Sequence, residues 1–316
     1  DEITSVNVSE WNKVQTIQGE KELYDYDFYI DCTGFSRLLI SAVGSEWQSY
    51  SKYLKMKEAI VFPTPEGDEI PIWTLAKAMD AGWMFRIPVQ GRTGNGYIFD
   101  SDFITAEQAH TEVEKYLGHG VEVAKHIKFD PGTLDKAWIS NVCAIGLSQS
   151  FVEPLEASSI GSSINQTFLL AQRLVNYNEE TINRYNLEVT AIMDNIRDFI
   201  VLHYITERRD TPFWKAVSEV TLPDSLDKNL RMWKVRMPIA DDMTTHTKKV
   251  LFNEYNYALV MHGLGLFDNE SILKQYETVP QGAKDHVEQS IQHKLEFDKT
   301  KTIPHKLMLQ LLRRLT

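Results

Sequence analysis

The spacing of apolar residues divides the chain into a mixed first half and a helical second half. Up to about residue 146, short apolar or alternating runs predict strands over 27–33, 58–63, 83–89, 96–101, 124–129 and 138–145, and helices near 36–42, 73–80 and 106–117. From about residue 151 helical spacing predicts a helix from Ser158, with Ile160, Ile164, Phe168 and Leu174 on one face, and helices over 179–207, 211–219, 224–234, 246–262, 270–276, 283–296 and 304–315. This pattern predicts an α+β fold with a sheet-rich domain over residues 1–157 and a mostly helical domain over 158–316.

Strand-like segments occur from the very first residues of the chain. Residues 1–9 alternate, residues 11–20 are polar with a turn at Gly19, and Asp27–Gly34 is an apolar strand that runs into a glycine. A sheet built from these pieces alone would have open edges, which folded proteins avoid. We therefore expect the sequence to be the later part of a longer chain.

Composition excludes several classes of protein. Asp and Glu number 44 against 33 Lys and Arg, a net charge of −11, so the chain lacks the positive charge that binding to nucleic acid or to an anionic membrane surface requires. The two cysteines, Cys32 and Cys143, cannot form a disulfide framework, and no Cys/His spacing typical of zinc occurs. Without an 18-residue apolar run or a signal peptide, a soluble cytoplasmic protein without a metal is expected.

Two segments of the first half suggest chemistry without specifying it. Asp27–Gly34 ends a strand in Thr-Gly, where a glycine lets the backbone approach a dinucleotide, although most such junctions are simple turns. Cys32 on this strand is predicted to be packed core. In Gly82–Pro88, alternation places Trp83, Phe85 and Ile87 on one face, and the following Thr93–Gly96 predicts a hairpin turn. By spacing alone, an aromatic core strand with a hairpin is the favoured interpretation of the second segment.

A third segment, Ala144–Ile160, runs from an apolar strand through Gly146 and a polar loop to the start of a helix. Free N–H groups at 158–160 and the helix dipole predict an anion site, and Glu156 beside it is a candidate acid, base or charge stabiliser. The alternative is that Ser158 caps the helix and Glu156 is a solvated carboxylate.

A fourth segment, Arg197–Tyr204, places charged residues and a histidine on the long helix. Arg197, Asp198 and His203 could form a catalytic cluster, but helical spacing favours structural ion pairs and a histidine satisfied within the fold.

Taken together and in order, five blocks of the chain resemble the flavin-dependent tryptophan halogenase family, as in a bacterial or phage member. The blocks are Asp31–Phe35, Trp83–Pro88, Arg92–Tyr97, Ala144–Leu147 with Phe151–Glu156, and Arg197–Tyr204. The resemblance implies an FAD-binding mixed-sheet domain, incomplete in this sequence, joined to a mostly helical domain. It also implies FADH2 from a separate flavin reductase, a halide (chloride, bromide or iodide) oxidised to hypohalous acid, and halogenation of an electron-rich aromatic substrate. The resemblance leaves open whether the protein forms a homo-oligomer.

The resemblance also assigns roles to individual residues. Glu156 matches the family's active-site glutamate, and Ser158 and Ser159 match the backbone site for halide at the helix start. The residues expected to lie at the flavin are Gly34, Gly146, Leu147 and Ile160. The signature that distinguishes halogenases from related monooxygenases falls on Trp83, Phe85, Ile87 and Pro88.

The chain departs from the family pattern at several of these positions. Phe85 stands where the signature has a second tryptophan, Ala157 lacks a side-chain hydroxyl, and Ser159 stands where the family has glycine, so halide affinity or preference could differ. The family's tyrosine-rich substrate segment does not occur after Trp214, so a phenol, an indole or another electron-rich aromatic is as good a substrate candidate as tryptophan. The family's G-x-G-x-x-G loop and catalytic lysine, which the resemblance assigns to the FAD pocket and to catalysis, are also absent from this sequence. The leading hypothesis is a halogenase; the alternatives are a flavin monooxygenase on the same scaffold and a non-catalytic helical interaction module.

Overall fold

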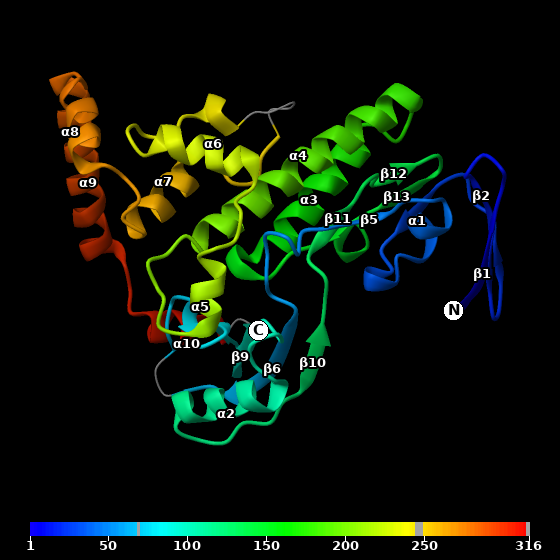
Figure 1. The fold of residues 1–316 in the computed structure, drawn as a ribbon, viewed down its shortest axis with the longest axis horizontal. Coiled ribbons are helices and arrows are strands. Elements are labelled where there is room, and N and C mark those ends of the chain that lie inside the picture. Colours follow the sequence, from blue (N-terminus) through cyan, green and yellow to red (C-terminus); the bar gives the residue numbers. More distant parts are fainter. Residues whose placement is uncertain (68–69, 244–248, 314–316) are drawn as a thin grey trace. The chain divides into compact units, whose positions relative to one another are not determined.

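The first half of the chain is mixed sheet and helix and the second half is helical, so the predicted α+β class is confirmed (Figure 1). The computed structural model describes residues 1–67, 70–243 and 249–313. The chain packs as two units. Unit 1 comprises Asp1–Lys57, Lys128–Leu230 and Pro238–Gly265, and unit 2 comprises Glu58–Ile127, Arg231–Met237 and the described part of Leu266–Thr316. Each predicted domain contributes chain to both units, so the boundary at residue 157 stays a prediction.

Short strands of unit 1 form three small sheets. They are β1 (Ile3–Val8), β2 (Val14–Gly19), β3 (Leu23–Tyr24), β4 (Tyr29–Asp31), β5 (Trp47–Ser49), β11 (Gly132–Leu134), β12 (Trp138–Ile139), β13 (Val142–Ala144) and β14 (Ser150–Phe151). The orders are β1-β2-β3, β12-β13-β4 and β14-β11-β5, and the pairing is antiparallel except between β13 and β4, which run parallel. Apolar side chains of β2, β4, β11, β13 and helix α1 (Leu38–Ala42) form one core.

Two predictions for unit 1 are wrong in detail. The strand predicted over 138–145 is a pair of strands, because the chain turns at Ser140, whose φ is +50°. The side chain of Asn141 in this turn is buried and bonds to both the N–H and the C=O of Val14, at 2.9 Å each, which anchors the turn to β2. Cys32 is exposed rather than packed in the core, because the alternation along β4 turns Asp31 inward and Cys32 outward.

The inward-facing Asp31 shapes the turn after β4. Its Oδ2 accepts the N–H groups of Leu39 and Ile40 at 2.9 Å each, and its Oδ1 accepts the N–H and the hydroxyl of Thr33. A carboxylate that accepts the free N–H groups of a helix start satisfies donors that the helix itself leaves unpaired. The Thr33-Gly34 turn therefore depends on one buried carboxylate.

We expect Asp31→Ala to lower the free energy of unfolding by about 3 kcal/mol, because it leaves the buried N–H groups of Leu39 and Ile40 without an acceptor. Urea denaturation of the two proteins measures the difference. The exposed Asp25, changed to alanine, is the control and should leave the midpoint unchanged. A loss for Asp31→Ala no larger than that of the control would contradict this account.

Unit 2 is built on a five-stranded sheet with the order β10-β6-β9-β8-β7. Its strands are β6 (Glu58–Pro65), β7 (Leu75–Met79), β8 (Gly82–Val89), β9 (Arg92–Phe99) and β10 (Lys125–Lys128). Helix α2 (Ala106–Leu117) contributes Ala109 and Val113 to a core with side chains of β6, β7, β8 and β9. Thr105 caps this helix in a capping box with Gln108.

Two predictions for this sheet are wrong. Residues 73–80, predicted as a helix, contain β7, because the helix formers of Leu75–Met79 pair with β8 along their whole length and tertiary pairing overrides intrinsic propensity. The hairpin turn predicted at Thr93–Gly96 lies instead at Gln90 and Gly91, since Val89 pairs with Arg92. Thr93–Gly96 belongs to β9, and Gly96 is required there because an added Cβ would lie 2.5 Å from the Phe85 ring.

The second half of the chain is a series of helices. They are α3 (Ser158–Ala171), α4 (Glu179–His203), α5 (Pro212–Val217), α6 (Asp224–Trp233), α7 (Glu254–Gly263), α8 (Asn269–Glu277), α9 (Gln281–Lys301) and α10 (His305–Arg313). Helix α4 runs alongside α3 in unit 1 (Figure 1). The helix predicted from residue 246 begins at Glu254, because the side chain of Asn253 caps it; residues 246–248 lie outside the described residues. Among the described helices, none has the length and apolarity needed to cross a bilayer.

Candidate active site

The loop between β14 and α3 contains two glutamates, Glu153 and Glu156, and its last two residues have an unusual backbone conformation. Glu156 has a φ of +64° and Ala157 a φ of +49°, both in the left-handed region. A residue other than glycine in this region costs about 1–2 kcal/mol, and such strain concentrates at functional loops. The conformation ends the chain's extended path at Pro154 and starts α3 at Ser158.

Glu156 pairs with the histidine at the end of α4. Its Oε1 lies 3.2 Å from Nε2 of His203, and its side chain is 41% exposed against 18% for the histidine. The hydrogen bond from His203 lowers the pKa of Glu156 and its charge adds to this effect, outweighing the rise that partial burial causes. Glu156 is therefore held as a carboxylate that is paired with His203 and is also partly exposed to solvent.

Glu153, three residues before Glu156, is hydrogen-bonded to Tyr204, the residue that follows His203. It is buried and accepts the hydroxyl of Tyr204, whose ring stacks on Trp214 with the centroids 6.2 Å apart. His203 and Tyr204 are the last residue and the C-cap of α4. The end of this helix thus holds both carboxylates of the loop.

The start of α3 lies directly after Glu156 and has the features of an anion site. The N-cap position is occupied by Ala157, and no side chain of the described residues caps this end, so Ser158 is not the cap that the alternative required. The hydroxyl of Ser158 is buried without a hydrogen-bond partner in the described part of the protein. Ser159, next in the first turn, is half-buried. A buried donor beside free N–H groups at a helix start suits a small anion.

The four residues predicted to lie at the flavin all belong to unit 1. Gly34 and Gly146 follow the parallel strands β4 and β13, with φ of +68° and +71°. The N–H of Gly34 donates to Oγ of Ser148, two residues after Gly146, at 2.8 Å, which joins the two strand ends. The side chains of Leu147 and Ile160 are exposed.

The exposed apolar side chains continue along α3. Ile160, Ile164 and Phe168 lie one turn apart and are 73%, 51% and 65% exposed, whereas the polar Ser162 and Gln166 are buried. Exposed apolar stripes of this kind mark ligand or protein contacts.

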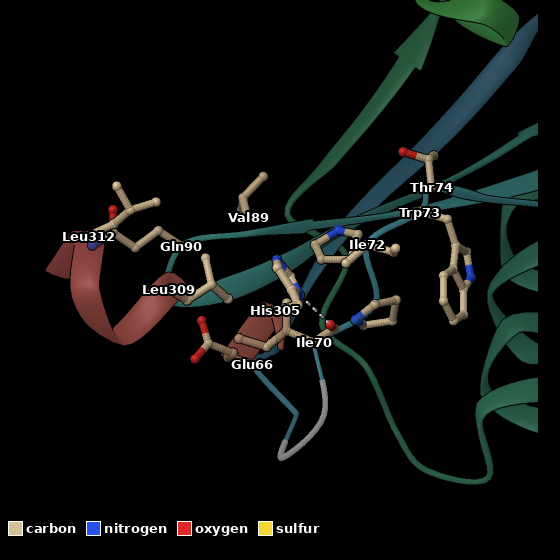
Figure 2. A pocket seen from close by; sticks show the side chains of 12 residues that line it. Glu66, Ile70, Ile72, Trp73, Thr74, Val89, Gln90, His305, Leu309 and Leu312 are labelled. Carbon is tan, nitrogen blue, oxygen red and sulfur yellow. Dashed lines mark hydrogen bonds between the residues drawn. The ribbon is translucent and has the colours of Figure 1, made fainter. Parts of the chain in front are cut away.

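The signature residues lie on β8 in unit 2. Trp83 and Phe85 have ring centroids 6.1 Å apart, which confirms that they share a face, while Met84 points into the core of the unit. Pro88 lines a cavity of about 580 Å³ within unit 2, which Figure 2 shows between the end of β8 and α10. In this cavity the ring of His305 bonds to the carbonyl of Ile70 at 3.0 Å.

The charged residues of α4 other than His203 are structural. Arg197 lies 2.6 Å from Asp194 and 2.7 Å from Asp198, and Asp198 accepts the hydroxyl of Ser225. Asp198 is buried, and desolvation raises its pKa although Arg197 opposes the shift. The predicted ion pairs are confirmed. His203, predicted as a satisfied histidine, is the residue of this segment that contacts the candidate site.

The chain belongs to the tryptophan halogenase family, whose sequence model matches residues 1–278. Tryptophan 6-halogenase SttH of Streptomyces toxytricini is 33% identical over 248 residues, which cover 76% of this chain and 47% of that protein. Tryptophan 7-halogenase RebH of Lentzea aerocolonigenes is 32% identical over 275 residues, 80% of this chain and 51% of that protein. The chain therefore spans about half the length of the curated relatives it matches.

Solved structures show the same fold. The crystal structure of SttH superposes with a TM-score of 0.85 at 28% identity, covering 96% of this chain and 61% of that one. BrvH, a flavin-dependent halogenase from Brevundimonas sp. BAL3, gives a TM-score of 0.84 at 26% identity, covering 98% and 64%. The resemblance inferred from the five sequence blocks is confirmed.

Proposed function

We propose that the protein is a flavin-dependent halogenase that acts on an electron-rich aromatic substrate of the indole or phenol type. The observation that carries the proposal is that a charged glutamate, Glu156, comes directly before the start of α3. Among the described residues, no side chain caps this helix start and the buried hydroxyl of Ser158 has no hydrogen-bond partner. An acid–base group and an anion site side by side suit a reaction that consumes halide and removes a proton from carbon. Membership of the tryptophan halogenase family supports this reaction class.

Halide binding is assigned to the first turn of α3. The backbone N–H groups of Ser158 and Ser159, with the Ser158 hydroxyl, would hold chloride, bromide or iodide at the positive end of a 14-residue helix. Ala157 contributes no hydroxyl, so the backbone carries most of the site.

FAD binding in unit 1 is assigned to Gly34, Gly146, Leu147 and Ile160. The two left-handed glycines lie where a side chain would obstruct a closely approaching cofactor, and the exposed Leu147 and Ile160 offer an apolar surface to a flat ring. FAD, when bound as FADH2, supplies the reaction with oxygen that converts halide to hypohalous acid. Hypohalous acid and an aromatic C–H group then give a C–halogen bond and water, and Glu156 is placed to accept the proton that the ring carbon loses.

The proposal includes a separate flavin reductase and a cytoplasmic setting, because the enzyme consumes reduced flavin. Phe85 and Ala157 depart from the family pattern and motivate a flavin monooxygenase as the alternative, which membership of the tryptophan halogenase family does not favour. That enzyme would consume oxygen and reduced flavin but form hydroxylated product without any need for halide.

One assay separates these functions. The protein is incubated with FAD, a flavin reductase, NADH, oxygen and chloride, bromide or iodide, against a panel of indoles and phenols, and products are identified by mass spectrometry. Halogen mass shifts that vanish without halide are expected. Oxygen additions alone would establish the monooxygenase, and the absence of both product and bound flavin would support a non-catalytic module.

A further inference from the structure

Both ring nitrogens of His203 face oxygen atoms. Nδ1 lies 2.8 Å from the carbonyl oxygen of Phe199, and Nε2 lies 3.2 Å from Oε1 of Glu156. A carbonyl oxygen only accepts, so Nδ1 carries a hydrogen. In the neutral ring Nε2 would then be a bare acceptor opposite a carboxylate, which is unfavourable. The contact therefore requires one further proton between Nε2 and Oε1.

The histidine is the fixed member of this pair. Its ring meets the buried ring of Phe199 edge to face, with the centroids 4.9 Å apart, and Phe199 in turn stacks on Phe252 at 4.1 Å. Glu156 is more exposed and lies on a loop whose backbone is strained. The position of the Glu156 carboxylate is thus determined by its contact with His203 on α4 rather than by its own loop.

We infer that His203 is a positioning residue for Glu156: its Nε2–H holds Oε1 and so leaves Oε2 directed to accept the proton of the substrate. This inference rests on the proposed function, in which Glu156 acts on the aromatic ring. Fixing a reacting group through a neighbour with a locked ring orientation is a common requirement of proton transfer.

The same contact sets the pH range in which Glu156 is charged. The titratable groups around it are His203 at the end of α4 and, in its own loop, Glu153, which accepts the Tyr204 hydroxyl. His203 lowers the pKa of Glu156, so the carboxylate stays ionised to lower pH than an ordinary glutamate. Removing the histidine raises this pKa, and the fall of the rate at acid pH moves to higher pH.

The first experiment replaces His203 with phenylalanine, which keeps a ring against Phe199 and removes both nitrogens. We expect kcat for halogenation to fall about 10- to 100-fold, as for loss of a hydrogen bond to a charged group. The acid limb of the kcat profile should move to higher pH, and KM for halide should stay unchanged. His203→Gln, which restores a donor toward Glu156, should recover part of the rate.

The matched control is His110→Phe. His110 in unit 2 also lies 3.2 Å from a glutamate, Glu114, so this variant loses a pair of the same length elsewhere in the protein. Its rate and pH profile should equal those of the wild type. An unchanged profile in His203→Phe, or a glutamine variant no better than phenylalanine, would overturn the positioning role.

A second measurement is independent of activity. In the protein labelled with 15N-histidine, the ring nitrogens report which of them carries hydrogen, and we expect both Nδ1 and Nε2 of His203 to carry one. A ring without hydrogen on Nε2 would overturn the inference even if the enzyme is active, because Nε2 would then have nothing to donate to Oε1 of Glu156. If the wild-type protein forms no halogenated product, the proposed function fails. The nitrogen spectrum then still shows whether His203 donates a hydrogen bond to Glu156. The same spectrum of the wild-type protein tests the inference in the case that His203→Phe does not fold.

Discussion

Glu156→Gln is expected to lower the rate of halogenation about 100-fold or more while flavin binding is retained, because general acid–base groups contribute at least this much. Glutamine has the shape of glutamate, and its carbonyl oxygen can still accept the hydrogen bond from His203. The substitution therefore removes the charge and the basicity and keeps the position. Single-turnover product formation with reduced flavin measures the rate, and flavin fluorescence measures binding.

The control for this substitution is Glu114→Gln, the same change in a second glutamate that pairs with a histidine at 3.2 Å. It should leave both the rate and flavin binding unchanged. Wild-type product formation by Glu156→Gln would remove Glu156 from the mechanism and leave the family assignment intact.

The site residues that can be predicted from the sequence lie close together along the chain. Gly146, Glu156 and Ser158 lie within one segment in which an apolar strand, a polar loop and a helix start follow one another, and each signal is local. The parallel pairing of β4 with β13, which joins Gly34 to Gly146, is a long-range contact that no local signal specifies. The resemblance of the whole set of blocks assigned both glycines to the flavin but did not predict this pairing.

The contact of His203 with Glu156 was not predicted from the sequence. His203 is 47 residues from Glu156 and completes the regular spacing of Ile192, Ile196, Phe199 and Ile200 on α4, so the pattern alone favours a residue packed within the fold. Its position as the last residue of the helix is the signal that could have been used, because a side chain there faces the loops at the helix end.

Periodicity also left open which face of α3 is buried. The spacing of Ile160, Ile164 and Phe168 identifies a face but does not show that this face is exposed. The buried side of the helix carries the polar Ser162 and Gln166 besides Leu169 and Leu170. The side chain of Gln166 accepts the N–H of Gly146 and donates to Gln149. Because α3 supports the loop at Gly146 through a hydrogen bond from its buried side, the face with Ile160, Ile164 and Phe168 is available for a ligand or partner, and amphipathicity alone does not predict this.

Ser159→Leu should raise KM for bromide and chloride about tenfold, equivalent to about 1.4 kcal/mol of binding free energy. The proposed halide site is made of N–H groups in the first turn of α3, and a branched apolar side chain at Ser159 would obstruct the approach of the ion and replace water around it. Leucine is a better helix former than serine, so the helix should be retained. Thr167→Leu, an exposed position two turns further along α3, is the control.

Halide titrations of the rate at saturating substrate measure the effect, and circular dichroism verifies that the helix content is unchanged. The size of the expected effect follows from geometry: the substitution leaves Glu156 and His203 in place, so kcat at saturating halide should stay near that of the wild type while KM rises. An equal loss of kcat at every halide concentration would instead mean that the start of α3 acts by holding Glu156. In that case the anion site would have to lie elsewhere, and the buried hydroxyl of Ser158 would require another partner.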